Sequence, residues 1–414
     1  MTELDFAKKI HGLGGKAYLV GGAVRDKFRG VKAHDRDYCV TNVDEKTFAE
    51  AFPNAAKFGK SFPVYSVDID NAYCEVAFAR TERKVGTGYR GFEILFSTSV
   101  TIEQDLFRRD TTINAMAIEL LSGELIDPFG GREDVLNKKI RAVSEHFIDD
   151  PVRALRAARQ SAQFNFEICA ETIEAMRHCG KELANEPTER IFDELETALK
   201  TDKPSIFFRN LERAGLLEIT FPELAILRGK IQPTFYHPEG DAYEHTLKIL
   251  DDVAKINPKP LVRFAALMHD IGKGTTPTEM LPHHYKHELR GLDVLNQMNK
   301  RMTLPNDWKK AAAFVIREHM RAPRLNKAGK IVDLLLSLKF DAKDFCDIIS
   351  IDNHGLPPYL EHAQDIIDEL KKIGGKDAPP ELEGEQIGKW IHSARIRRFV
   401  EIFRKIEEEE NFVR

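Results

Sequence analysis

The sequence LVGGAVRD, residues 19–26, places two glycines between an apolar run and a segment with helical spacing. A strand followed directly by a helix is a building unit of mixed α/β domains. Glycines at such a turn let backbone N–H groups approach a phosphate, and a helix N-terminus favours anions. Arg25 adds a guanidinium beside Gly21 and Gly22. The stretch predicts an α/β domain with a phosphate-binding turn, although a turn that only closes the strand fits it equally well.

The rest of the chain divides into a β-rich first third and a helical remainder. Short runs bounded by Gly, Asn and Asp predict strands at AYLVGG, RDYCV, PVYSVDI, YCEVAFAR and MAIELL. From about Arg141 onward, apolar residues recur every three or four positions, which predicts helices such as VRALRAARQSAQF and TERIFDELETALK. Pro and Gly at 228–241 predict a domain boundary, and the segment 371–385 is typical of a linker.

The composition excludes several classes of protein. The 414 residues are 42% hydrophobic and 31% charged with a net charge of −5, so any nucleic-acid site must be a local basic surface. Five cysteines without a Cys-x-x-Cys pair argue against a disulfide scaffold or a cysteine zinc site. No apolar run approaches the roughly 18 residues that span a membrane, and the N-terminus is acidic where a signal peptide is basic. We expect a cytoplasmic protein without a membrane anchor.

Three carboxylates form the first candidate site. Asp35 and Asp37 lead into the predicted strand Tyr38-Cys39-Val40, where residues two apart point to the same face. Two carboxylates on one face repel each other unless a cation lies between them, and Mg²⁺ prefers oxygen ligands. Glu75, on a later strand, offers a third carboxylate to the same ions. The pattern predicts a magnesium site, although acidic pairs of this kind are more often solvated loops.

Further motifs gain weight from their order. Asp110 and Asn114 follow Arg109 in RRDTTINA and lie one turn apart if that segment is helical. A DPFGG turn at 127–131 comes next, and then Asp150 and Arg153 stand three apart at a predicted helix start. Singly, these motifs also fit a turn and a surface salt bridge.

In this order and spacing, the motifs resemble the class II tRNA nucleotidyltransferases, which include the CCA-adding enzymes and bacterial poly(A) polymerases within the polymerase-β superfamily. The resemblance covers most of the chain. It implies an α+β fold: a polymerase-β-like head with a mixed sheet, an all-helical neck and body, and a helical histidine-aspartate (HD) domain. The boundaries we expect are 1–140 for the head, 141–230 for the neck and body, 238–360 for the HD domain and 361–414 for a helical tail.

The resemblance also implies roles for individual residues. Asp35, Asp37 and Glu75 match the catalytic metal-binding carboxylates, which would hold Mg²⁺. The positions that match the family's nucleotide-binding residues are Gly21, Gly22, Arg25, Arg109, Asp110, Asn114, Asp150, Arg153 and Arg156. Glu189 and Arg190 match the helix that supports Asp150 and Arg153. Asp149 departs from the family's usual glutamate, and residues 81–92 resemble its flexible loop, tied to the switch from C to A, although a plain hairpin also fits them.

The resemblance implies that Asp150 and Arg153 select the incoming base, and this role has a simple chemical reason. Cytosine and adenine both present an exocyclic amine donor beside a ring-nitrogen acceptor. One Asp acceptor and one Arg donor satisfy that shared edge and reject G and U, which display the opposite pattern. CTP and ATP are therefore the expected substrates.

A second constellation lies in the helical region. His269-Asp270 in HDIGKG resembles the signature of HD phosphohydrolases, and His245 upstream and Asp352 downstream complete the pattern. His287 and His319 match positions that extend the site in some members. Imidazole with carboxylate suits a first-row transition metal such as Ni²⁺, which can activate water against a phosphoester. The complete set indicates a working hydrolase.

The remaining expectations concern partners and alternatives. The expected partners are the tRNA 3′ end and acceptor arm, recognised by shape, with helical arginines tracking phosphates: Arg153, Arg156 and Arg159, and Arg395, Arg397 and Arg398. The chain is expected to be a monomer or homodimer. One alternative is a poly(A) polymerase or an enzyme that adds only CC or A. Another is an HD hydrolase with a non-catalytic RNA-binding N-terminal module, against which the intact Asp35, Asp37, Asp150 and Arg153 count.

Overall fold

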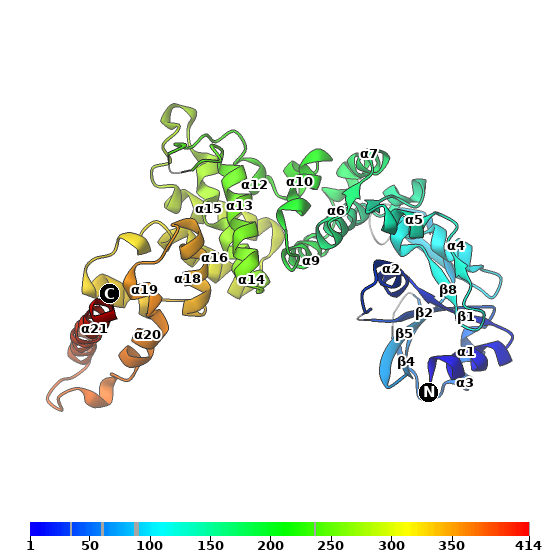
Figure 1. Ribbon diagram of the computed structural model, residues 1–414, viewed down its shortest axis with the longest axis horizontal. Helices are drawn as coiled ribbons and strands as arrows, with labels where there is room; N and C mark the ends of the chain where they lie inside the picture. Colours follow the sequence, from blue (N-terminus) through cyan, green and yellow to red (C-terminus); the bar gives the residue numbers. More distant parts are fainter. Residues whose placement is uncertain (34, 59–61, 87–90, 236, 414) are drawn as a thin grey trace. The chain divides into compact units, whose positions relative to one another are not determined.

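A computed structural model gives the fold of residues 1–33, 35–58, 62–86, 91–235 and 237–413 (Figure 1). The chain folds into two compact units. The first comprises Met1–Ala198 and Ile206–Thr220, and the second comprises Leu199–Ser205 and Phe221–Arg414. Strands are confined to the first unit among the elements described, and the second unit is built from helices.

A seven-stranded mixed sheet forms the centre of the described part of the first unit, in the order β3-β4-β5-β2-β1-β8-β9. Strand β2 runs parallel to β5 and antiparallel to β1. The five predicted strands are confirmed as β1, β2, β4, β5 and β8. The strands in order are β1 Lys16–Val20, β2 Asp37–Thr41, β3 Ala56–Phe58, β4 Val64–Ile69, β5 Ala72–Phe78, β8 Ala117–Glu119 and β9 Leu125–Ile126.

Helices cover both faces of this sheet. Neighbouring residues of a strand point to opposite faces, so β2 contributes side chains to both. On one face, Tyr38 packs with Phe6 of α1 (Glu3–Gly12) and Phe48 of α3 (Glu45–Ala51). On the other, Cys39 packs with Leu106 of α4 (Ile102–Phe107). Burying a side chain of this size contributes about 1.5–3 kcal/mol, so the two cores hold β2, and with it the start of that strand, in place.

A two-stranded hairpin follows β5. Its strands are β6 (Arg80–Lys84) and β7 (Phe92–Phe96), which pair antiparallel. Lys84 Nζ lies 2.7 Å from Glu182 of the short helix α8. The predicted flexible loop at 81–92 is a β-hairpin in its described part, and residues 87–90 lie outside the described residues.

Helices complete the first unit. The predicted helix over 152–164 is confirmed as α6, and the Asp127 carboxylate accepts from the N–H groups of Gly131 and Arg132, which caps α5. A small parallel pair, β10 (Lys139–Ile140) and β11 (Glu167–Ile168), lies beside them. The helices are α2 Gly22–Arg29, α5 Gly131–Leu136, α6 Val152–Phe164, α7 Ala170–His178, α8 Gly180–Leu183, α9 Thr188–Leu199, α10 Ser205–Arg213 and α11 Leu217–Thr220.

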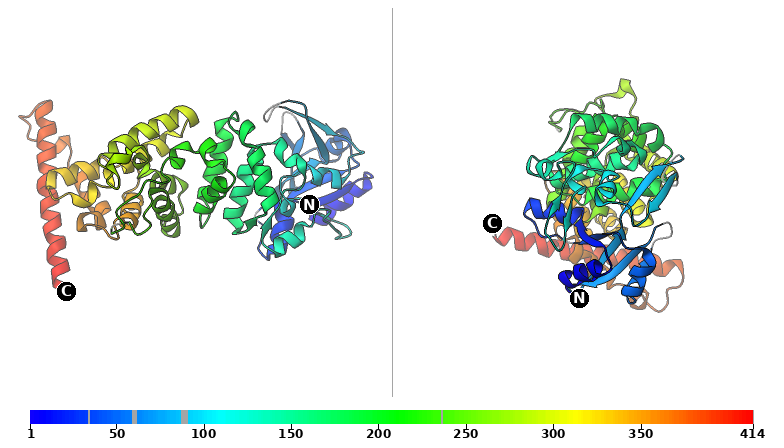
Figure 2. Two further views of the ribbon diagram at one scale, coloured as in Figure 1. Left: turned by 90° about the horizontal axis from the view of Figure 1, so that it is seen from above. Right: turned by 90° about the vertical axis from the view of Figure 1, so that its right-hand side faces the viewer.

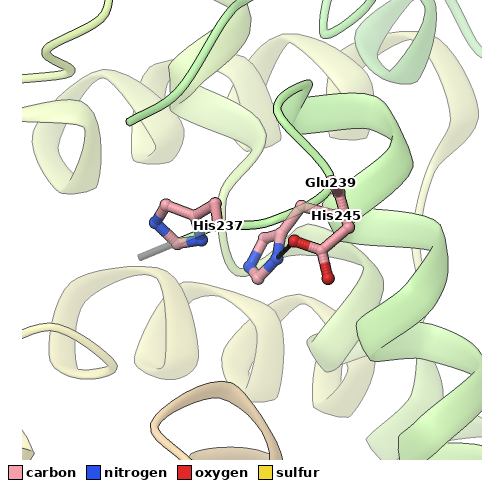
Figure 3. A group of neighbouring side chains, drawn as sticks. All are labelled: His237, Glu239 and His245. Carbon is pink, nitrogen blue, oxygen red and sulfur yellow. Dashed lines mark ion pairs between the residues drawn. The ribbon is translucent and has the colours of Figure 1, made fainter. Parts of the chain in front are cut away.

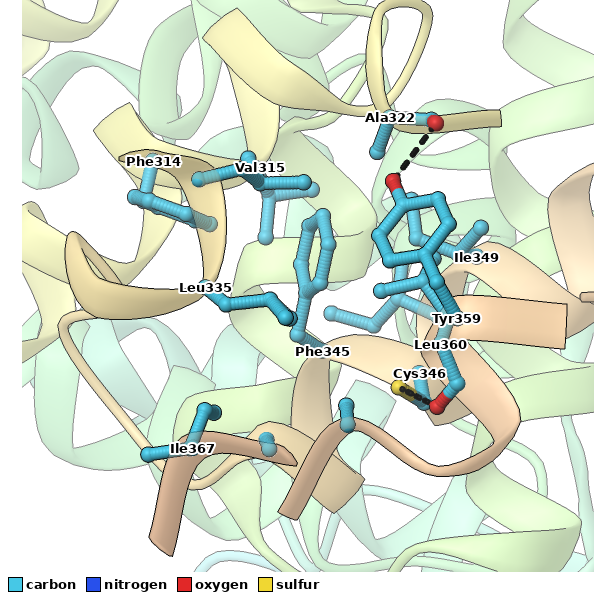
Figure 4. Packing of buried hydrophobic residues seen from close by; sticks show 14 of the residues in the cluster. Phe314, Val315, Ala322, Leu335, Phe345, Cys346, Ile349, Tyr359, Leu360 and Ile367 are labelled. Atoms are coloured by element: carbon cyan, nitrogen blue, oxygen red, sulfur yellow. Dashed lines mark hydrogen bonds between the residues drawn. The ribbon is translucent and has the colours of Figure 1, made fainter. Parts of the chain in front are cut away.

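The second unit is helical, and Figure 2 shows its last helix as one long element. Its core surrounds Phe345, which packs against Phe314; nearby, the Tyr359 hydroxyl donates to the Ala322 carbonyl at 2.7 Å (Figure 4). This core fixes α18, which ends at Asp352. The helices are α12 Pro222–Ala225, α13 Ala242–Ile256, α14 Pro260–Met268, α15 His287–Met302, α16 Asn306–Glu318, α17 Ala328–Leu336, α18 Ala342–Asp352, α19 Pro358–Glu361, α20 Ala363–Lys371 and α21 Glu385–Val413.

The fold class expected from the sequence is confirmed: a head with a mixed sheet precedes a helical region. All five cysteines are unpaired, in agreement with the absence of a disulfide pattern. Within the described ranges, no helix combines the length and the apolar character needed to cross a bilayer.

Candidate active sites

The carboxylates of the first site gather at the start of β2. Asp37 opens that strand and pairs directly with Glu75 of the parallel strand β5. Desolvation by the surrounding protein and then the Glu75 carboxylate raise the pKa of Asp37, while Arg109 lowers it. Asp35 precedes the strand and is exposed, so only Asp37 takes a strand position. The negative charge of Asp35 adds to the rise in the pKa of Asp37.

The Gly-Gly turn lies against two side chains of the predicted site. Gly21 has φ +66°, a conformation that favours glycine, and a Cβ there would lie 3.1 Å from Arg109 Nη1. Helix α2 begins at Gly22. Arg25 Nη1 donates to Asn114 Oδ1 at 2.6 Å, and its guanidinium lies 4.3 Å from the Phe164 ring centroid. The turn therefore joins Arg109, Arg25 and Asn114 in one contact group.

Arg109 is held by a buried acid that the sequence did not single out. Asp105 accepts from both Arg108 and Arg109, at 2.6 and 3.0 Å. Burial would raise the pKa of Asp105, but the two guanidinium groups keep it below its usual value. A charged, twice-paired carboxylate fixes Arg109 more firmly than a surface ion pair would.

Asp110 and Asn114 are brought together by a 3₁₀ turn and not by the predicted helical turn. Asn114 ends the short 3₁₀ segment Thr112–Asn114, and its amide donates to Asp110 Oδ1 at 3.3 Å. Gln160 Nε2 donates to the other carboxylate oxygen at 3.0 Å. Burial would raise the pKa of Asp110, but Arg156 and the hydrogen bonds from the Thr111 N–H and the Asn114 amide lower it. The segment is therefore a fixed 3₁₀ turn and no α-helix.

The base-pairing candidates stand at the start of α6. Arg190 Nη2 donates to both oxygens of Asp150, at 3.0 and 2.8 Å. Arg153 is buried and donates to the His146 carbonyl at 2.7 Å, which uses one of its five N–H donors. Glu189 is exposed, and the second acid that pairs with Arg190 is Glu186, at 2.7 Å.

The arginines predicted to track phosphates are largely paired within the protein. Arg156 and Arg159 share Glu194, at 3.1 and 2.5 Å. In α21, Arg398 pairs with Glu369 and Arg395 donates to the Ile373 carbonyl at 2.9 Å. Contact of these helices with tRNA stays a prediction.

Most residues of the first site line one cavity of about 510 Å³. The lining residues do not include Asp35, Gly21, Gly22 or Arg25, but Arg109, which lines the cavity, lies against Gly21. The sequence-predicted residues that line the cavity are Asp37, Glu75, Arg109, Asp110, Asn114, Asp150, Arg153 and Arg156.

The second site, in the other unit, brings together all six of its predicted residues. His245 Nε2 lies 3.4 Å from Asp352 Oδ1, and His269 Nε2 lies 3.2 Å from Asp270 Oδ2. The other oxygen of Asp270 lies 3.1 Å from His287 and 3.3 Å from His319. Asp270 thus stands between two groups of possible ligands, one with His245, His269 and Asp352, the other with His287 and His319.

These groups fit a transition metal. Within each group the ligand atoms lie within 4.8 Å of one another. The Nε2 atoms of His245 and His269 are buried without a hydrogen-bond partner, which is costly unless a cation satisfies them. Burial would lower the pKa of His269, but Asp270 and Asp352 raise it to about 9. The two carboxylates, beside imidazole nitrogens without a hydrogen-bond partner, favour a cation at this position.

Sequence reasoning missed Gln232 and Glu239, two side chains beside this cluster. Lys273, in the HDIGKG motif, is buried, and its ammonium lies 2.5 Å from both Asp270 Oδ2 and Gln232 Oε1. Glu239 lies 3.6 Å from His245 Nδ1. Gln232 and Glu239 belong to the segment predicted as a domain boundary, where Pro and Gly favoured the interpretation as a linker.

Comparisons with known proteins find relatives of both units of the chain. Three family models match: the poly A polymerase head domain at residues 17–141, the probable RNA and SrmB-binding site of polymerase A at 165–227, and the HD domain at 242–346. The multifunctional CCA protein of Shewanella denitrificans is 40% identical over 336 residues, 80% of this chain and 79% of that protein. The chain belongs to the multifunctional CCA protein family.

Longer matches within the multifunctional CCA family support this assignment. The protein of Acinetobacter baumannii is 37% identical over 406 residues, which cover 93% of this chain and 97% of that protein. Among solved structures, the CCA-adding enzyme of Bacillus stearothermophilus, in complex with CTP, matches with a TM-score of 0.68 and covers 98% of each chain. At 22% identity, that match shows a shared fold.

Proposed function

We propose that the protein adds CCA to the 3′ end of tRNA from CTP and ATP without a nucleic-acid template. The observation that carries this proposal is the single cavity shared by Asp37, Glu75, Asp150 and Arg153. It offers metal-binding oxygens and a base-reading pair to one nucleotide. The family's relatives are named for CCA, and the enzyme of the matched structure binds CTP.

The residues of this cavity divide the work. Asp37 and Glu75, with Asp35 nearby, would hold Mg²⁺, which supplies charge stabilisation to the transferring phosphoryl group. Arg109, Asp110 and Asn114 would orient the triphosphate and ribose. The Asp150 carboxylate retains lone pairs for an exocyclic amine after pairing with Arg190, and Arg153 retains donors for the ring nitrogen. Because Arg190 and His146 fix this pair, the protein itself serves as the template.

The second site would hydrolyse phosphoesters, with 2′,3′-cyclic phosphates and 2′-phosphates of RNA ends as the substrates to test first. His245, His269, Asp270 and Asp352 would hold a transition metal such as Ni²⁺, with His287 and His319 as additional ligands; the metal supplies an activated water. The expected division at 140, 230 and 360, the contact of the tail with tRNA, a cytoplasmic location and the oligomeric state stay predictions.

The deciding experiment uses a tRNA that lacks its 3′ CCA, Mg²⁺, and CTP and ATP singly and together. Products that stop at CCA when sequenced support the proposal. Long A tails would instead identify a poly(A) polymerase, which the matching poly A polymerase head domain makes the main alternative. Addition of only CC or only A would identify a partial enzyme.

A further inference from the structure

The four histidines of the second site differ in what their other ring nitrogen contacts. The Nδ1 atoms of His269, His287 and His319 lie 2.7 Å from Ala266 O, 2.8 Å from His284 O and 3.0 Å from Ile316 O, respectively. Each contact is to a backbone carbonyl three residues earlier. His245 has no such contact: its Nδ1 faces the Glu239 carboxylate (Figure 3).

The facing atoms of Glu239 and His245 are both buried and both lack a hydrogen-bond partner. Glu239 Oε2 and His245 Nδ1 lie 3.6 Å apart, slightly beyond hydrogen-bond distance. Leaving two buried polar atoms without a hydrogen bond destabilises the fold. A small rotation of either side chain closes the gap, so the pair is suited to form one hydrogen bond when His245 takes its ligating orientation.

The backbone around Glu239 is fixed by its own hydrogen bonds. Gln232 N–H donates to the Gly240 carbonyl at 2.9 Å, which closes the loop that carries Glu239. The next residue, Asp241, caps α13 by accepting from the N–H groups of Tyr243 and Glu244. His245 lies one turn into that helix, so the loop that carries Glu239 leads directly into the capped turn that carries the ligand.

We propose that Glu239 is a positioning residue for His245. Its carboxylate accepts the Nδ1 proton, which fixes the tautomer, leaves Nε2 free to bind a metal and makes the imidazole a stronger ligand. The carboxylate therefore acts through His245 and touches neither metal nor substrate. This inference rests on the proposed metal-dependent function of the second site.

A competing use of the same side chains is direct metal binding. The ligand atoms of His237, Glu239 and His245 lie within 4.8 Å of one another, and the rings of His237 and His245 are 4.5 Å apart. A metal held by these three residues would need His245 Nδ1 without a proton. The competing arrangement therefore adds an ion, whereas the positioning role leaves the number of bound ions unchanged.

The test measures Co²⁺ binding to the full-length, metal-free protein by competition with a chelator, together with the visible spectrum of the bound ion. Glu239→Ala should weaken Co²⁺ binding about 10- to 100-fold and shift the spectrum, since partners of this kind typically affect affinity by that factor. Glu239→Gln keeps an acceptor oxygen and should lose less. Glu361→Ala removes an exposed glutamate from α19 and should change nothing.

His245→Ala separates failure of this inference from failure of the proposed site. If His245→Ala weakens Co²⁺ binding and Glu239→Ala and Glu239→Gln do not, the positioning role is wrong while the site stands. If His245→Ala has no effect, the site itself is wrong. Loss of one complete equivalent of Co²⁺ in Glu239→Ala, with the remaining ions bound normally, would overturn the positioning role in favour of direct binding. Nucleotide addition should stay unchanged in the glutamate variants.

Discussion

The two candidate sites of this molecule are both proposed for phosphate chemistry. They differ in how closely their possible metal ligands lie to one another. In the helical unit, ligand atoms from six side chains already lie within contact of one another. In the head, Asp35, Asp37 and Glu75 form no group of that kind: among the described residues, every cluster of three or more close ligands lies in the helical unit. The site in the helical unit is preassembled, whereas the site in the head needs further oxygen ligands to bind a metal ion.

The difference follows from the ions that each site suits. Mg²⁺ keeps several waters and is usually bound by one or two carboxylates together with substrate phosphates. We therefore expect the head, which offers few ligands, to complete its metal shell only when a nucleoside triphosphate enters. Imidazole suits transition metals, which the ligands of the protein can bind before any substrate enters. The predictions below test whether metal binding requires substrate in the first unit and not in the second.

The largest effect is expected from Asp37→Ala. Loss of the strand ligand should reduce nucleotide addition at least about 10³-fold, which corresponds to about 4 kcal/mol of transition-state stabilisation. The fold should persist, because the pKa of Asp37 is raised, which means that its surroundings disfavour the charged carboxylate. Addition rates and thermal melting of the same sample provide the measurement. Asp68→Ala, an exposed aspartate on β4, is the control.

Asp35→Ala should also abolish addition if Asp35 reaches the ion from its loop. A rate near that of the unchanged protein would remove Asp35 from the site. The same result for Asp37→Ala would overturn the assignment of the whole metal site.

The next effect is the loss of hydrolysis in a variant that combines His269→Ala and Asp270→Ala. Hydrolysis of 2′,3′-cyclic phosphates should fall to background, because ligands disappear from the buried cluster. Nucleotide addition should stay within about twofold, since its cavity is lined only by residues of the other unit. Both activities are measured on one purified sample, with the metal varied.

Asp270→Asn is a second variant for this experiment that is less prone to misfolding. It keeps the size of the side chain that lies against the buried Lys273. Loss of both activities in a folded protein would show that the units are coupled. Persistent hydrolysis would place the metal ligands elsewhere or reveal a contaminant.

Regular patterns in the sequence were sufficient to predict most of the framework. Alternation in the strands and three- and four-residue spacing in α6 predicted these elements because one periodic face is buried in each. The resemblance to tRNA nucleotidyltransferases and HD phosphohydrolases supplied the candidate residues, and the structure places eight of them around one cavity and six in one cluster.

The supporting contacts were harder to predict because they depend on tertiary structure. Asp110 meets Gln160 fifty positions later, and the contact of Asp150 with Arg190, forty positions later, was expected only from the family resemblance. No local period marks such pairs. Asn114 lies in a 3₁₀ turn where helical spacing suggested an α-helix. Glu239 escaped notice because its Pro- and Gly-containing loop has the composition of a linker, although hydrogen bonds close it.

Metal addition tests the comparison directly. Co²⁺ or Ni²⁺ at about 100 times its dissociation constant should stabilise the fold by about 2.7 kcal/mol, which raises the melting temperature of a unit of this size by roughly 5–10 °C. Mg²⁺ alone should cause little shift, and Mg²⁺ with CTP should stabilise the head. Melting curves with each ion, with and without CTP, are the measurement. An equal shift with Mg²⁺ alone would contradict the contrast between the sites.

The smallest effect concerns base choice, which only the head should possess. Arg153→Ala removes the donor expected to meet the ring nitrogen of C or A. An unsatisfied polar partner costs about 1–3 kcal/mol, so the preference for CTP and ATP over UTP and GTP should fall about 5- to 150-fold. Competition assays with paired nucleotides measure the ratio directly, and hydrolysis in the helical unit should be unaffected.

Arg153→Lys tests whether base choice depends on the planar shape of the guanidinium or only on its positive charge. Lysine keeps the positive charge beside Glu82, whose carboxylate lies 3.7 Å from the Arg153 guanidinium, but it lacks the planar fork that matches a base edge. Selectivity should therefore fall in both variants, while the charge-preserving variant retains more of the rate. If the rate falls in Arg153→Ala and selectivity is unchanged, Arg153 contacts phosphate or supports the fold, and the template function would rest on Asp150 and the helix around it.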